Sequence, residues 1–129
     1  MRYLMIHKLD ESLPEAWNPS PEFIEKMGAF IGEVAASGVL LAAEGVTQSS
    51  EGAIIRKASG AISVTDGPFS EAKEVIGGFA LIDVDSREQA LELGRRFADL
   101  FGEVSVEVRR VFEDQDLAAA ETASAERSG

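Results

Sequence analysis

Apolar side chains occupy both alternating sets of positions in residues 2–9 (RYLMIHKL), a pattern typical of a β-strand that is covered on both faces. Leu4 and Ile6 share one face of this strand, whereas Tyr3 and Met5 share the other. Residues 10–19 follow with two prolines and the single tryptophan, and we expect them to form a loop.

A helix is predicted to begin after this loop. Ser20 supplies a capping hydroxyl group and Pro21 suits the first helical position. Gly38 is expected to end the helix in the left-handed conformation. Between them runs an apolar stripe with three- and four-residue spacing: Phe23, Met27, Phe30, Ile31 and Val34.

Short apolar runs bounded by turn residues predict the next strands. They cover residues 39–46, 53–58, 61–66 and 78–85, and the middle two form a hairpin around Ser59-Gly60. Between the hairpin and the last of these strands, we expect Ser70 to cap a turn of helix over residues 70–76. Gly77-Gly78 would terminate that turn.

The remaining chain predicts one more helix and one more strand. Ser86 and Gln89 form a capping-box pattern, and the buried stripe of the helix would be Ala90, Leu93, Phe97 and Leu100. Residues 103–112 alternate almost strictly and predict the last strand of a domain that spans residues 1–112. The Ala-, Glu- and Ser-rich tail 113–129 is either a disordered, flexible segment or a frayed helix.

With the hairpin set aside, two βαβ halves remain, which predicts an α+β fold of the ferredoxin-like kind with an antiparallel sheet. Both helices should cover one face of that sheet because βαβ crossovers are right-handed. Apolar residues on both faces of the first strand require a cover for the other face as well. We therefore expect a homodimer whose sheets face each other, with space for a ligand between them.

Composition narrows the classes of function. The net charge is −11 and no basic stripe is present, so direct binding to nucleic acid is not expected. The absence of cysteine removes disulfides, thiol nucleophiles and Cys-based metal sites. The apolar run at the N-terminus is too short for a membrane span or a signal peptide, so the cytoplasm is the expected location. No metal-ligand spacing and no Gly-rich nucleotide loop is visible, and no cofactor is expected.

The segment DGPFSEAKE, residues 66–74, closely resembles the DGPFAETKE signature of the DGPF group of YCII-related proteins, and differs from it at Ser70 and Ala72. The resemblance extends over residues 1–112, through the MRYLMIHK start, the GVLLAAEGV and IGGFALIDV strands and the VEVRRVFE end. It implies a dimeric α+β barrel, in agreement with the expected homodimer. It also implies a stress or regulatory context beside extracytoplasmic-function sigma factors.

The same resemblance bears on chemistry. A His–Asp pair in the best-described branch of the YCII-related proteins suggests enzymatic activity, but that branch has its histidine in the first helix. Residues 21–37 of this chain contain no histidine, so that mechanism does not transfer.

Three residues are candidates for acid–base chemistry. Asp66 opens the signature and is either a general base or a turn-capping carboxylate. Glu44 interrupts an apolar strand, and either faces the cavity of the expected dimer or marks the solvated end of the strand. His7, the single histidine, alternates with Tyr3 and Met5, so we expect it on the face away from the helices, as a packing residue or a proton-transfer group.

Four more residues are candidates for substrate binding. Lys73 balances Asp66 or Glu44, holds an anionic substrate, or is a solvated charge. Arg109 either binds substrate or forms an ion pair with a neighbouring strand or across the dimer. Trp17 either covers a cavity or anchors its loop, and Phe69 is an expected packing anchor of the DGPF segment.

Two functions follow as alternatives. The first is a cofactor-free enzyme that performs acid–base chemistry on a small organic molecule in a cavity near the dimer interface. The second is a non-catalytic ligand-binding or regulatory protein.

Overall fold

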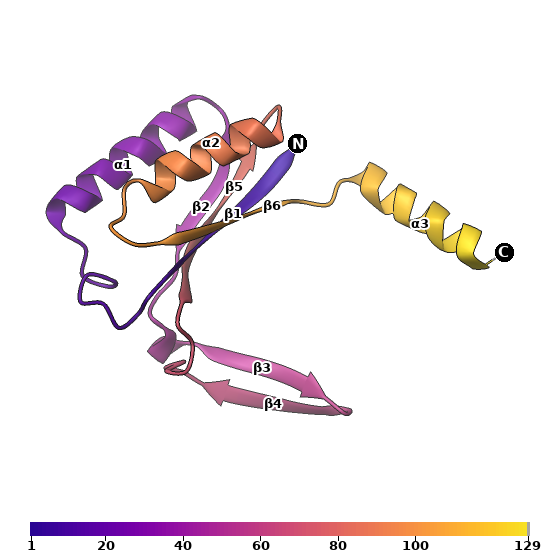
Figure 1. Ribbon diagram of the computed structural model, residues 1–129, viewed down its shortest axis with the longest axis horizontal. Coiled ribbons are helices and arrows are strands. Elements are labelled where there is room, and N and C mark those ends of the chain that lie inside the picture. The colour runs from indigo at the N-terminus through magenta and orange to yellow at the C-terminus, as the bar shows by residue number, and fades with distance from the viewer. Residues whose placement is uncertain (129) are drawn as a thin grey trace.

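The computed structural model describes residues 1–128, with side-chain exposure for all of them except Ala120 and residues 123–128. A four-stranded antiparallel sheet, a separate hairpin and three α-helices make up this α+β fold (Figure 1). The elements run β1 (Arg2–Leu9), α1 (Pro21–Ala36), β2 (Leu40–Gly45), the 3₁₀ turn η1 (Ser49–Glu51), β3 (Ala53–Ala58), β4 (Ala61–Asp66), β5 (Val75–Asp83), α2 (Arg87–Ala98), β6 (Ser105–Arg110) and α3 (Asp114–Ser128).

The strand order of the main sheet is β2-β5-β1-β6, and β3 and β4 pair only with each other in a second sheet. Without the hairpin, the elements therefore run strand–helix–strand–strand–helix–strand, as the sequence predicts. The predicted strands of the hairpin, 53–58 and 61–66, agree with β3 and β4 at both ends. Figure 1 shows α1 and α2 together on one side of the main sheet.

Two of the three predicted serine caps are present, those of α1 and α2. The Ser20 hydroxyl accepts a hydrogen bond from the Phe23 amide at 3.1 Å, and the Ser86 hydroxyl accepts one from the Gln89 amide at 3.2 Å. Gly38 follows α1 with a φ of +81°, a conformation that costs a non-glycine residue free energy. These local signals lie within a few residues of each other, which is why the sequence alone indicates them.

The core lies between the helices and the sheet. It is centred on Ile82, which is fully buried in β5, and on Ala90 in α2. The helices contribute the two stripes that the sequence predicts, including Phe30 and Val34 from α1 and Phe97 from α2. Gly94 lets α2 approach closely, since a Cβ atom there would lie 3.4 Å from a methyl group of Val108 in β6.

The predicted face of His7 is wrong: its side chain lies on the helix-covered face of β1 and not on the face away from the helices. Tyr3 and Met5 are buried under the helices, and His7 lies on this same face beside Phe97 of α2. Leu4 and Ile6 lie on the opposite face, which no helix covers, opposite Leu81 and Phe79 of β5. Periodicity could not decide between the faces because both sets of side chains are apolar.

The predicted turn of helix over residues 70–76 is wrong. Strand β5 already begins at Val75, which pairs with Leu9 of β1 and is buried. Gly77 and Gly78 consequently lie inside β5 and do not end a helix. The Ala72 amide donates to the Phe69 carbonyl group at 3.0 Å, so only a tight turn forms there. Burial of a β-branched residue in a long-range strand pair overrides the local helical pattern.

The DGPF segment closes a junction between the hairpin and the body. The amide and the hydroxyl of Ser49, a buried residue, both donate to the carboxylate of Glu11, the amide over 2.7 Å. The Ser49 hydroxyl in turn accepts a hydrogen bond from the Phe69 amide at 3.0 Å. Phe69 packs its ring near Gly52, and the Gly67 amide donates to the Gly52 carbonyl group at 2.9 Å.

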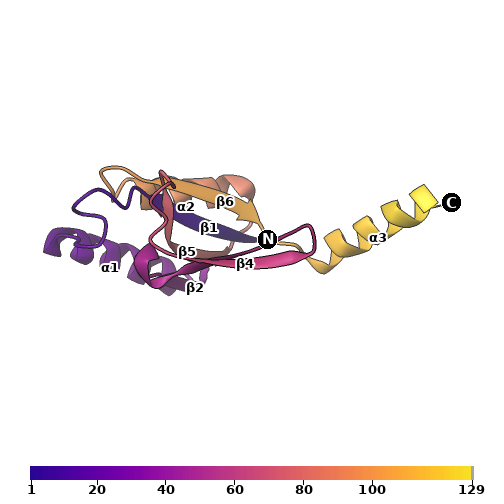
Figure 2. The ribbon, with the colours of Figure 1, turned by 90° about the horizontal axis from the view of Figure 1, so that it is seen from below.

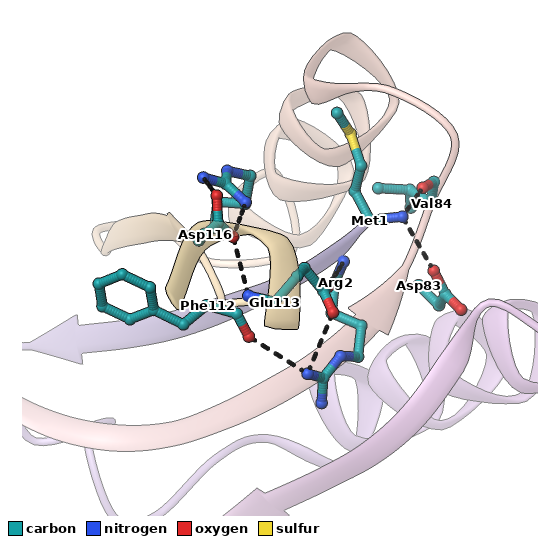
Figure 3. A network of polar contacts seen from close by, with 8 residues as sticks. Met1, Arg2, Asp83, Val84, Phe112, Glu113 and Asp116 are labelled. Atoms are coloured by element: carbon teal, nitrogen blue, oxygen red, sulfur yellow. Dashed lines mark hydrogen bonds and ion pairs between the residues drawn. The ribbon is translucent and has the colours of Figure 1, made fainter. Parts of the chain in front are cut away.

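The two ends of the domain are joined by polar contacts where β1 begins and β5 ends (Figure 3). The Arg2 guanidinium group donates to the Phe112 carbonyl and to the Glu113 carboxylate, each at 3.4 Å. The Met1 amino group donates to the Val84 carbonyl at 2.9 Å.

Of the two alternatives for the tail, the structure shows the helix, α3, which projects away from the layered body (Figures 1 and 2). A bidentate ion pair from Arg110 fixes its first turn and lowers the pKa of Asp116 to about 2. Among residues 1–128, no helix is long and apolar enough to cross a membrane.

Gly67 is the tightest point of the junction, because a Cβ atom there would lie 1.7 Å from the Ser49 carbonyl oxygen. We expect Gly67→Ala to lower the free energy of unfolding by about 3 kcal/mol, since the backbone of η1 must shift. Urea denaturation followed by circular dichroism measures the change. Gly32→Ala is the matched control: nothing lies within 4 Å of its Cβ position, and it should stabilise α1 by about 0.5–1 kcal/mol. Equal stability of Gly67→Ala and the wild type would contradict the steric argument.

Candidate functional site

A cavity of about 870 Å³ lies at one end of the domain, on the helix-covered side of the main sheet. Its walls come from β1, β2 and β5, the loop before α1, the first turns of α1, and the end of α2 with the segment that follows it. A volume of this size suits a small organic molecule. All of these walls belong to a single chain, on the side away from the uncovered sheet face.

Aromatic rings form much of the cavity wall. The Phe97 and Phe101 ring centroids each lie 5.4 Å from that of His7, and 5.2 Å from each other. Phe23 of α1 extends the group with its ring edge-on to Phe101 at 4.9 Å. Aliphatic and thioether side chains complete the apolar lining: Met5, Leu9, Leu13, Met27, Ile31 and Leu100.

His7 lies above the two glycines of β5. A Cβ atom at Gly77 would be 2.4 Å from His7 Nε2, and a Cβ atom at Gly78 would be 2.8 Å from His7 Cε1. Any other residue at either position would collide with the imidazole ring. The glycine pair therefore makes room for His7 at the cavity wall, a role that its position along the sequence did not suggest.

Burial lowers the pKa of His7 below its usual value, because desolvation disfavours the charged imidazolium. Among residues 1–128, no side chain or backbone group forms a hydrogen bond with the ring. The imidazole is therefore neutral at pH 7 and offers one nitrogen lone pair and one N–H group to a molecule in the cavity.

Trp17 also lines the cavity, from the loop before α1. Its indole Nε1 atom is buried and lacks an acceptor within the described part of the chain. A buried N–H group without an acceptor costs free energy, so Trp17 has an unused donor in the cavity wall.

Charged residues surround the aromatic part of the cavity. Lys26 is neutralised by Glu22 one turn earlier, at 3.0 Å. The carboxylates of Asp10, Glu15 and Glu103 also line the cavity, and none has an ion-pair partner within residues 1–128. The margin of the cavity is consequently negative, which disfavours anionic molecules.

The other residues that the sequence singles out lie elsewhere or at the margin. Glu44 is exposed at the end of β2, where it is both the cross-strand partner of Phe79 and part of the cavity margin. Asp66 is exposed as the last residue of β4, and Lys73 is exposed in the turn before β5.

Phe69 is half-buried in the hairpin junction. Arg109 is exposed on the uncovered face, where it donates to Glu107 at 3.1 Å. Asp66, Lys73, Phe69 and Arg109 do not line the cavity, so the structure brings together only His7, Trp17 and, at the margin, Glu44.

Sequence reasoning overlooked three groups at the site. The sequence pattern places Phe97 in the core stripe of α2, gives no signal for Phe101, and predicts a helix end at the glycine pair. His7 lies beside the glycines because β1 pairs with β5, and beside the two rings because α2 packs on the sheet. No local pattern encodes either contact.

Metal binding finds no support in residues 1–128: no three His, Cys, Asp or Glu side chains are grouped so that they could hold an ion.

The fold and the cavity define the class: an α+β domain whose two helices and antiparallel sheet enclose a mainly apolar site. Residues 1–115 match the model of the YCII-related domain. An uncharacterized protein of Rhizobium meliloti (strain 1021) is 31% identical over 97 residues, which cover 74% of this chain and 78% of that protein. The chain belongs to the YCII-related family, which confirms the resemblance seen in the DGPF segment.

The single histidine makes the pKa of His7 directly measurable by NMR titration. We expect a value below 6.5 in the folded protein, and a return towards 6.5 in Gly77→Ala, whose methyl group displaces the ring into solvent. Gly28→Ala, a helix position with nothing within 4 Å of its Cβ, should leave the value unchanged.

The same shift makes stability depend on pH. As pH falls through about 6.5, the unfolded chain takes up a proton at His7 before the folded protein does, so the free energy of unfolding decreases. Subtracting the profile of His7→Gln isolates this term from the carboxylates that titrate at lower pH. A His7 pKa at or above 6.5 in the wild type would contradict the burial of the ring.

Proposed function

We propose that this protein binds a small, mainly apolar organic molecule in the cavity beside His7. The observation that supports it most strongly is the concentration of aromatic and aliphatic side chains around one neutral, hydrogen-bonding ring. Apolar walls with a few polar groups are the usual composition of ligand sites. His7 and the Trp17 indole N–H would orient the bound molecule, and the negative margin favours a neutral or cationic one.

A second candidate is acid–base catalysis at the same site. The lowered pKa of His7 supports it, because a neutral imidazole is present at pH 7 and can accept a proton from the bound molecule. The reaction would need no cofactor. Asp66 and Glu44, proposed from the sequence as partners in this chemistry, do not contact His7, so the imidazole would act without a carboxylate partner in the described chain.

We also propose that the protein is a homodimer that uses the uncovered face of the main sheet, as in a dimeric α+β barrel. The exposure of Phe79 and Ile76, which is 38% and 50%, supports a cover for this face. Beside them, Glu107 bridges Lys8 at 3.0 Å and Arg109 at 3.1 Å, and these two cations lower its pKa.

Binding can be followed through Trp17, the single tryptophan. We expect N-phenyl-1-naphthylamine, an uncharged apolar probe, to change Trp17 emission in a saturable way by energy transfer. Ala43→Leu, at a lining position, should weaken binding at least about tenfold by filling the cavity, which corresponds to about 1.4 kcal/mol.

Ala42→Leu is the matched control, because Ala42 pairs with Leu81 on the other face of the same strand. Equal affinity of the two variants would place the probe outside the cavity and contradict the proposed site.

The catalytic candidate is tested on the molecule that copurifies, which native mass spectrometry of gently purified protein identifies. If His7 transfers a proton, His7→Gln should lower turnover by about 100-fold or more. The affinity of the His7→Gln variant for the same molecule, measured through Trp17 emission, should stay within a few-fold of the wild type. Identical product formation by the wild type and His7→Gln would reject His7 as a general base, while saturable binding without product would favour the non-catalytic function.

A further inference from the structure

The β3–β4 hairpin is almost entirely exposed. Eleven of its twelve strand residues are exposed, and Ile54 alone is half-buried. Three large apolar side chains are among the most exposed of the chain: Ile55 at 70%, Ile62 at 68% and Val64 at 63%. Figure 1 shows the hairpin projecting beyond the main sheet, on the side away from α1 and α2.

These three side chains share one face of the hairpin. Ile55 is the cross-strand partner of Val64, and Lys57 is the partner of Ile62. Positions two apart along a strand face the same way, so Ile55, Lys57, Ile62 and Val64 form one surface, which we call the arm face. The opposite face carries Ile54 and Arg56 with Thr65 and Ser63 opposite them.

A hairpin of this kind needs a cover. A two-stranded hairpin is at best marginally stable in water unless a hydrophobic face packs on something else. The β-branched residues of the arm face favour a strand, but in this chain they gain no burial. An exposed strand surface of this composition is also prone to nonspecific association.

The charge of the hairpin indicates what would cover it. Arg56 and Lys57 are opposed only by Asp66, so residues 53–66 carry a net charge of +1 in a chain whose net charge is −11. A basic projection is attracted to an acidic surface, and repels a basic one. A second copy of this chain is acidic as a whole, with a net charge of −11.

The chain also offers a matching apolar surface. The uncovered face of the main sheet carries Leu4, Ile6, Phe79 and Leu81 at its centre, as two cross-strand pairs of β1 and β5. Two exposed acidic residues flank them, Glu44 at the end of β2 and Asp83 at the end of β5. Asp83 pairs with the Met1 amino group at 3.3 Å, and the cations Lys8 and Arg109 of this face both pair with Glu107. Glu44 has no ion-pair partner within residues 1–128, so it is the carboxylate that complements an apolar surface with a lysine.

We propose that the β3–β4 hairpin is a dimerisation arm, whose arm face packs on the Phe79 and Ile76 end of the uncovered sheet face of a second copy, beside the contact between the two sheets, with Lys57 near the partner's Glu44. This rests on the homodimer proposed above and assigns its second contact surface. In a two-fold dimer the contact is made twice, so both unpartnered surfaces of each chain are covered at once.

Sedimentation velocity over a concentration series tests the arm. Ile55→Thr combined with Ile62→Thr should raise the dissociation constant of the dimer at least about 100-fold, because threonine keeps the strand preference while removing apolar area. Ile54→Thr is the control, since it makes one of these isoleucine-to-threonine changes in the same hairpin but on the opposite face, and its dissociation constant should stay within about threefold of the wild type.

A third variant separates this proposal from the dimer itself. Phe79→Ser should weaken the dimer by acting on the uncovered sheet face. If Phe79→Ser dissociates the dimer and the arm variant does not, the dimer stands and the arm is rejected. A wild type that remains monomeric throughout the concentration series overturns both. Equal losses in Ile54→Thr and the arm variant would reject the assignment of the arm face.

The absence of cysteine allows a direct test of where the arm binds. Val64→Cys, labelled with a benzophenone maleimide, is mixed with an isotopically heavy copy of the wild type and irradiated. We expect cross-links to heavy peptides from β1 and β5. Cross-links confined to light peptides of the same chain would overturn the proposal.

Discussion

The packing on the helix-covered side of the main sheet depends on the absence of side chains at Gly77 and Gly78. Gly78 lets β2 approach β5, because a Cβ atom there would lie 2.7 Å from the Glu44 carbonyl oxygen. Gly77 leaves room for the His7 imidazole, which then lies against Phe97 and Phe101. Strand β5 is central in the sheet, so a side chain at either glycine would disturb both its pairing and the cavity. The site therefore depends on two strand positions that have no side chain.

The DGPF segment supports the loop of the cavity wall through hydrogen bonds and packing, and its charged side chains take no part in this. Glu11 belongs to the loop that also supplies Trp17 to the cavity, and its carboxylate holds Ser49, which in turn holds Phe69. The cavity wall and the root of the hairpin therefore share one hydrogen-bonded junction. This accounts for a connection that is more elaborate than a turn requires: Gly67 fits where no side chain can, and Phe69 packs beside Gly52. Asp66 and Lys73 remain exposed.

Features encoded by neighbouring residues could be predicted from the sequence. The helix caps at Ser20 and Ser86, the left-handed Gly38 and both hairpin strands depend on local chemistry and agree with the structure. Features set by distant partners could not. Val75 belongs to β5 because it pairs with Leu9 of β1. His7 lies on the helix-covered face because the helices cover Tyr3 and Met5 and not the other apolar side chains of β1. Of the site, His7 and Trp17 could be selected by residue type, but their aromatic surroundings and glycine support required the β1–β5 register.

The margin of the cavity links the two proposed properties of the protein, ligand binding and dimerisation. Glu44 and Phe79 line the cavity and are also cross-strand partners whose side chains belong to the uncovered face. A second copy that packs on Phe79 would contact the same margin that a bound molecule touches. If the free energy of one event depends on this contact, the other must respond by the same factor, because linkage between two binding equilibria is reciprocal. A site enclosed by one chain would thereby sense the presence of the other, because Phe79 and Glu44 belong both to the cavity margin and to the uncovered face.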